Sequence, residues 1–101
     1  MNQQLLKQLK KMQAEMIAAQ KEIEESVFEA SAGGVVTVEV TGTKELKTIN
    51  VDDDFEVESN EDIKMLCDMI VAACQKAYDD IDKTTQEKLG KYNSMLGGGL
   101  F

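Results

Sequence analysis

The alternation between residues 36 and 41 limits what this chain can fold into more than any other feature of the sequence. Val36, Val38 and Val40 fall on one side of an extended chain, and the residues between them are polar. A period of two built from β-branched residues is typical of a strand that is buried on one face only. Polar residues follow from Gly42 onward, so we expect the next apolar run, residues 46–51, to fold back as an antiparallel partner.

Two further details refine this hairpin. Leu46 is out of step with Ile49 and Val51, which predicts a bulge or a wide turn near Leu46. Residues 27–32 also alternate, and they fit either a first strand or a frayed helix end. We favour the strand, because the Gly-Gly pair at 33–34 would then supply a hairpin turn. The sequence therefore predicts a three-stranded antiparallel β-meander.

A long helix is predicted before this sheet. A heptad-like spacing, alternately four and three residues, relates Leu5, Leu9, Met12, Met16, Ala19 and Ile23. No glycine or proline interrupts the pattern, and good helix formers fill the remaining positions. A helix of about 24 residues is roughly 36 Å long. This is longer than a compact domain of 101 residues requires, so we expect the helix to project from the sheet.

A second long helix is expected to begin at residues 59–62. The segment from 65 to 74 is apolar on nearly every face, which is typical of a buried helix. Because a small sheet covers only one side of it, we expect a second subunit to cover the other. The predicted interface residues are Met65, Leu66, Met69, Ile70 and Ala73.

The same helix carries both cysteines of the chain. Cys67 and Cys74 are about two helical turns, or roughly 10 Å, apart, which is too far for a disulfide. We interpret them as buried thiols that act as small hydrophobic side chains. The helical pattern fades near Gly90. The expected organisation is a single domain over residues 1–92, followed by a flexible glycine-rich tail over residues 93–101.

Charge is distributed unevenly along the chain. The net charge is −8, but residues 1–21 carry +3, residues 22–82 carry −13 and residues 83–101 carry +2. If the two helices run antiparallel, their lysines gather at one distal end, where a small basic surface faces phosphates. The lysines predicted to contact these phosphates are Lys7, Lys10, Lys11, Lys83, Lys88 and Lys91. The chain has no arginine, so we expect weak sequence preference.

The chemistry of an enzyme is missing from the sequence. The chain has no histidine, and the glycines at 97–99 are neither preceded by a strand nor followed by Lys-Ser/Thr. The aspartates at 52–54 lack the spacing and the glycine of a calcium-binding loop. We therefore expect no catalytic residue, cofactor, metal or small-molecule substrate. We also expect no membrane span and no secretion signal, which leaves the cytoplasm as the predicted location.

The order of these segments resembles the YbaB/EbfC family of bacterial nucleoid-associated proteins. The similar segments are a helix rich in Leu, Met, Lys and Gln, the strand Gly-Gly-Val-Val-Thr-Val, the run 46–52, the Ile-Val-Ala-Ala at 70–73 and the Gln-Glu-Lys-Leu-Gly-Lys at 86–91. The resemblance covers almost the whole chain. It implies a tweezer-like homodimer of α+β class that binds DNA in the nucleoid.

This sequence departs from the family pattern in three places. Lys44 stands where many relatives have a second turn glycine, the tail lacks prolines and the first helix carries lysines but no arginine. The last departure is a further reason to expect weak sequence preference.

A different function also fits two long helices joined by a hairpin. A prefoldin-like chaperone subunit, or an adaptor in protein interactions, would use Met12, Met16 and the segment 65–74 to hold clients. Dimer core is the favoured interpretation of those residues. Salt distinguishes the two functions, because lysine–phosphate binding weakens as salt rises and hydrophobic client binding does not.

Overall fold

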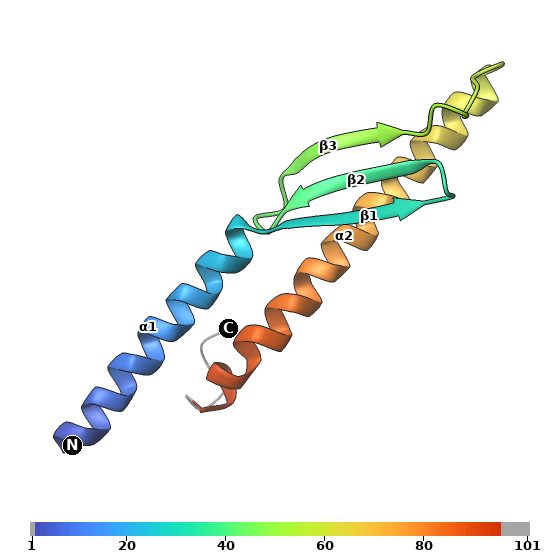
Figure 1. Cartoon of the computed structure of the whole chain (residues 1–101). Coiled ribbons are helices and arrows are strands. Elements are labelled where there is room, and N and C mark those ends of the chain that lie inside the picture. Colours follow the sequence, from blue (N-terminus) through green and yellow to red (C-terminus); the bar gives the residue numbers. More distant parts are fainter. Residues whose placement is uncertain (1, 96–101) are drawn as a thin grey trace.

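The structure, a computed structural model that describes residues 2–95, contains two long helices with a small sheet between them (Figure 1). The elements in chain order are α1 (Gln3–Glu25), β1 (Val27–Ala32), β2 (Val36–Thr41), β3 (Leu46–Val51) and α2 (Asn60–Met95). The molecule is elongated, with extents of 71 × 20 × 16 Å. The α+β class and the order of helix, meander and helix are confirmed.

Local hydrogen bonds define both ends of α1. Asn2 caps the N-terminus, where its Oδ1 accepts a hydrogen bond from the backbone N–H of Leu5 at 2.7 Å. At the other end, Ser26 has extended backbone angles, and its hydroxyl donates to the carbonyl of Glu22 at 2.6 Å. β1 begins at the next residue, so a single residue connects the helix to the sheet.

The sheet has the order β1-β2-β3, and both pairs are antiparallel. Gly33 and Gly34 form the first turn, with φ of 62° and 68°. Positive φ at two successive residues is typical of tight hairpin turns, and glycine adopts it readily. Between β2 and β3 the register shifts: Glu39 pairs with Thr48, whereas Val40 pairs with Leu46. The predicted bulge near Leu46 is confirmed, and it returns that residue to the face occupied by Ile49 and Val51.

The main core lies between the sheet and α2. Val36, Val38 and Val40 have no exposed surface, and they share a cluster with Ala73, Ala77 and Ile81 of the helix. α2 makes its sheet contacts mainly with β1 and β2, whereas β3 contacts mainly β2. One strand of the sheet is therefore left without a helix beneath it.

A second cluster joins α1 to the C-terminal half of α2. Ile23, Leu89 and Tyr92 are its buried members, and Met12, Met16 and Ala19 pack against them. The helices run antiparallel, so the start of α1 and the end of α2 lie at the same end of the molecule (Figure 1). We call this helix pair the arm and the three strands with the first half of α2 the platform.

One expectation about α2 is wrong, and another is not met within the single chain. The helix does not end near Gly90 but continues to Met95, because one exposed glycine costs a helix only about 1 kcal/mol. The cysteines are free as predicted, but in this chain Cys67 is exposed and Cys74 only partly buried. The flexible tail predicted for residues 93–101 lies largely outside the described residues. Within residues 2–95, no helix is long and apolar enough to cross a membrane.

Candidate nucleic-acid interface

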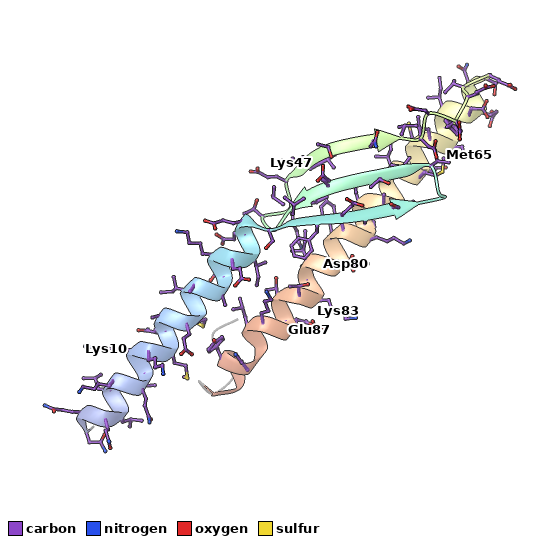
Figure 2. The ribbon with its side chains drawn as sticks, viewed as in Figure 1. Lys10, Lys47, Met65, Asp80, Lys83 and Glu87 are labelled. Carbon is purple, nitrogen blue, oxygen red and sulfur yellow. The ribbon has the colours of Figure 1, made fainter. Side chains whose placement is uncertain are left out.

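The N-terminal part of α1, residues 3–14, carries three lysines and no acidic residue. Lys7, Lys10 and Lys11 are exposed, and the first acidic residue of the chain is Glu15. Figure 2 shows Lys10 on the outer side of α1, away from α2. The heptad seam faces α2, so the intervening lysines are directed to solvent. The positive end of the helix dipole lies at the same end.

Lys91 joins this set from α2. Lys11 and Lys91 line the same groove between the two helices, a cavity of ≈ 480 Å³. Met12 and Tyr92 supply its apolar walls, and Glu15 also lines it. The Lys91 Nζ lies 5.0 Å from the centre of the Tyr92 ring, within the range of a cation–π contact. The antiparallel arm therefore brings together two lysines that are 80 positions apart in sequence.

Lys83 and Lys88 do not lie at the distal end. The Lys88 Nζ is 3.6 Å from Glu22 Oε1, close to where α1 meets the sheet. Lys83 comes two residues after Ile81, which belongs to the sheet core, and Figure 2 shows it on the side of α2 that faces away from α1. The expectation that all six lysines share one end is wrong for these two, because the sheet covers α2 as far as Ile81. DNA contact by either lysine stays a prediction.

A separate apolar surface lies under β3. Because Ile49 is paired with Val38, both side chains point to the face of the sheet that α2 covers. Val38 is fully buried by α2, yet Ile49 is 44% exposed and Leu46 is 43% exposed. The apolar face of the sheet therefore extends one strand beyond its helix.

The adjoining flank of α2 is apolar as well. The Lys76 Nζ donates to the carbonyl of Ser31 in β1 at 3.1 Å, so the Lys76 flank of the helix faces β1. The opposite flank lies toward β3, and it contains the 63% exposed Val71. Together, β3 and this flank form what we call the open face, which consists of Leu46, Ile49, Ile63, Cys67, Ile70, Val71 and Cys74.

The five predicted interface residues do not share one surface. Ile70 lies on the open face, whereas Met65 is exposed on the Lys76 flank. Leu66 and Met69 pack against the chain's own core, and so does the inner side of Ile70. Ala73 is fully buried there, which leaves it no surface for a partner. Sequence reasoning missed Leu46 and Ile49 as interface candidates. The available signal is the alternation of Ile49 with Val51, which continues the pattern of β2, whereas Leu46 reaches the same face only through the bulge.

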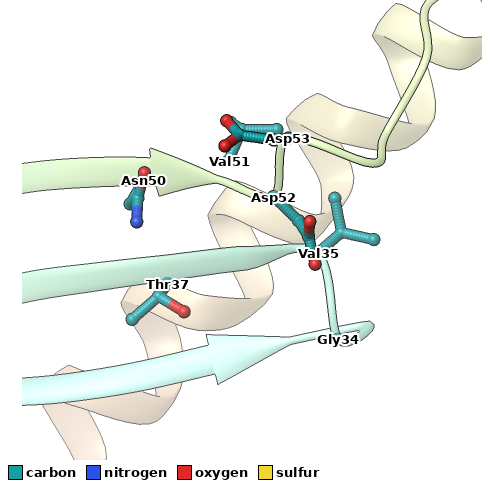
Figure 3. Close-up of a pocket in the computed structure, with 7 residues that line it drawn as sticks. All are labelled: Gly34, Val35, Thr37, Asn50, Val51, Asp52 and Asp53. Atoms are coloured by element: carbon teal, nitrogen blue, oxygen red, sulfur yellow. The ribbon is translucent and has the colours of Figure 1, made fainter.

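A polar cavity of ≈ 310 Å³ lies at the far end of the sheet (Figure 3). Its lining includes Thr37, Asn50, Asp52 and Asp53. Asp52 is tied into the loop, since its N–H donates to Val35 O at 2.8 Å and its Oδ1 accepts from the Asp54 N–H at 3.0 Å. Among residues 2–95, no group of three His, Cys, Asp or Glu side chains could hold a metal ion.

The fold is shared with a solved structure. The crystal structure of an uncharacterised protein from Helicobacter pylori matches 78% of this chain and 90% of its own, with a TM-score of 0.59 and 20% identity. At this identity the likeness defines the fold class alone: two long helices around a three-stranded meander.

The sequence comparisons identify the family. The YbaB/EbfC DNA-binding family matches residues 1–96. A nucleoid-associated protein of Clostridium novyi is 44% identical over 97 residues, which are 95% of this chain and 80% of that protein. Another, from Acetivibrio thermocellus, is 42% identical over 100 residues, covering 96% and 87% of the two chains. This chain belongs to the YbaB/EbfC DNA-binding family.

Proposed function

We propose that this protein is a homodimeric nucleoid protein that binds double-stranded DNA through its phosphates, with α1 as the main contact. The observation that carries the proposal is the exposed surface of α1, where Lys7 and Lys10 lie outside the groove, Lys11 lies at its edge and residues 2–14 contain no acid. The names of the relatives, nucleoid-associated proteins, support the nucleoid as its location.

The chemistry of these side chains favours phosphate contact over base reading. A lysine ammonium attracts a phosphate as a point charge, and the chain has no arginine to form the forked contact with guanine. We therefore expect weak sequence preference. Lys91 extends the set, since it shares a groove with Lys11. Lys83 and Lys88 are expected to contribute less, because Lys88 pairs with Glu22 and Lys83 lies on another side of the arm.

The acidic charge of the platform limits phosphate binding to the arm. Residues 22–82 carry a net charge of −13, and most of these residues lie in the platform. Phosphates are repelled by that part of the molecule and attracted by the outer face of α1. The same repulsion disfavours a DNA path across the outer face of the sheet.

A second copy is the partner we propose for the open face. Ile49 and Val71 are large apolar side chains with 44% and 63% of their surface exposed. Contiguous exposed apolar surface of this kind marks an interaction site. A two-fold contact places the same face of each copy against the other, so each copy can supply the helix that the partner's β3 lacks. The dimer then carries two arms.

A chaperone function fits the structure less well. Met12 and Met16 are partly buried against the cluster of Ile23, Leu89 and Tyr92. They stabilise the arm and are not displayed as a surface for clients.

The test is binding to several unrelated DNA duplexes at two salt concentrations. We expect similar affinities for all duplexes at each salt concentration and a steep loss of affinity as salt rises, because lysines displace condensed counterions. Binding to an unfolded protein client that persists at high salt, with no retention of any duplex at low salt, would instead favour the chaperone function.

A further inference from the structure

The turn between β2 and β3 is held in a costly conformation. Lys44 has φ of 67°, in the left-handed region that glycine adopts readily and other residues adopt uncommonly. The turn is closed by hydrogen bonds from the Lys44 N–H to Thr41 O at 2.8 Å and from the Thr41 N–H to Glu45 O at 2.9 Å. Glycine would fit this backbone more easily, so the lysine side chain is expected to have a role that glycine cannot supply.

That side chain reaches α2. The Lys44 Nζ lies 2.8 Å from Asp82 Oδ1, and this is the shortest ion pair among the described residues. Asp82 follows Ile81, the last α2 residue of the sheet core, so the ion pair lies where α2 leaves the platform and enters the arm.

The same turn also contacts the end of α1. The Gly42 N–H donates to Ser26 O at 3.0 Å, and a Cβ at Gly42 would lie only 1.8 Å from Ile23 O. Figure 1 shows the turn beside the point where α1 meets the sheet. One turn therefore contacts both helices of the arm at the level where the arm leaves the platform.

We propose that Lys44 is a positioning residue: through Asp82 it holds the arm at a fixed orientation to the platform, and it does not contact DNA itself. The other contacts at this level are the Gly42–Ser26 hydrogen bond and the longer ion pair of Lys88 with Glu22. Both side chains are partly exposed, at 46% and 61%. Because α2 runs unbroken from the platform into the arm, the arm reorients only by bending of α2 or movement of α1. A modest surface ion pair is sufficient to bias such a small change.

The consequence for DNA rests on the proposed function above. Two arms must present their lysines to one duplex at a defined separation. A loosely held arm binds the same phosphates but must first be ordered, and ordering weakens binding. Loss of the ion pair therefore lowers affinity without removing a phosphate contact.

The experiment compares Lys44→Gly, Lys44→Asp, Asp82→Lys and the double variant with Lys44→Asp and Asp82→Lys. Spin labels at Gln13→Cys and Thr48→Cys, with both native cysteines changed to alanine, report the distance from arm to sheet. Labelled chains are diluted with unlabelled protein, so that each distance lies within one chain. We expect a broader distance distribution in each single variant and a narrow one in the double variant, where the ion pair is restored with reversed charges.

DNA binding supplies a second measurement. Affinity should fall several-fold for Lys44→Gly, while the slope of log affinity against log salt keeps its wild-type value. Lys64→Gln is the matched control, because it removes a pair that lies within α2 alone, with Nζ 3.8 Å from Glu61 Oε1. It should leave the distances unchanged.

Three results would overturn the proposal. A salt slope flattened by about two units in the Lys44→Gly dimer would show direct phosphate contact. Unchanged distance distributions in the single variants would show that the pair positions nothing. Failure of the double variant to restore a narrow distribution would exclude the ion pair as the cause. If the wild type bound no DNA, the proposed function would fail, but the distance measurements would still decide the role of Lys44.

Discussion

At the scale of residues, two glycines of this chain show how differently the same side chain can be constrained. A Cβ at Gly42 would overlap the carbonyl oxygen of Ile23, which is backbone and cannot rotate away. A Cβ at Gly90 would meet nothing within 4 Å, and Gly90 lies inside α2. Gly42 is required because α1 approaches the turn closely, whereas Gly90 only lowers the stability of α2.

Alanine at these two positions should therefore change stability in opposite directions. Gly42→Ala should lower the free energy of unfolding by about 3 kcal/mol, the upper part of the usual range for overpacking. Gly90→Ala should raise it by about 0.5 to 1 kcal/mol, because alanine is the better helix former. Urea unfolding of both variants measures the difference. A Gly42→Ala variant as stable as the wild type would contradict the close approach.

At the scale of elements, the strands were predictable because their signals are local. The period of two around Val38, the glycine pair at 33–34 and the phase slip at Leu46 each determine the backbone within a few residues. The position of α2 along the sheet was not predictable in this way. It depends on long-range packing against the sheet, which reaches Ile81, so the sequence alone places Lys83 and Lys88 too close to the distal end.

The open face shows the same limit. Sequence alone indicated that the segment 65–74 was too apolar for one small sheet. It did not indicate which flank of the helix the sheet would leave uncovered, because nearly every face of that segment is apolar. In the structure, the hydrogen bond from Lys76 to Ser31 shows that one flank faces β1, and the exposure of Ile49 shows that the flank toward β3 is the uncovered one.

A charge on the open face should separate the dimer without unfolding the chain. Ile49 is exposed in the single chain, so Ile49→Asp leaves the monomer core intact but would bury an unpaired carboxylate in the dimer. We expect sedimentation to show a dimer for the wild type and a folded monomer for Ile49→Asp. Ile17→Asp is the control, because Ile17 is 64% exposed on α1, away from the open face, and it should remain dimeric. A wild type that sediments as a monomer at micromolar concentration would contradict the dimer.

Cys67 offers an independent probe of the same face. It is exposed in the single chain but lies among the residues that a second copy would cover. We expect slow reaction with a thiol reagent in the wild type and fast reaction in Ile49→Asp, since thiol reactivity requires access. Equally fast labelling in both proteins would show that Cys67 is not covered in the assembly.

At the scale of the whole molecule, shape and charge act together. The molecule is 71 Å long, the acidic platform occupies one part of it and the arm ends in exposed lysines. A net charge of −8 would argue against DNA binding if the charges were evenly spread. Because the acids lie mostly in the platform, the arm retains a local positive potential toward phosphates.

The salt dependence of DNA binding tests this account most directly. If about six lysines of the dimer contact phosphates, the slope of log affinity against log salt should be about −5. Changing Lys10 and Lys11 to Gln should weaken binding to all duplexes alike and flatten the slope by about two to four units, because each change occurs twice in a dimer. The matched control changes Lys47 and Lys64, which lie in the platform, to Gln and should keep the wild-type slope. A flattened slope in the control, with an unchanged slope in the Lys10 and Lys11 variant, would contradict α1 as the DNA-binding surface.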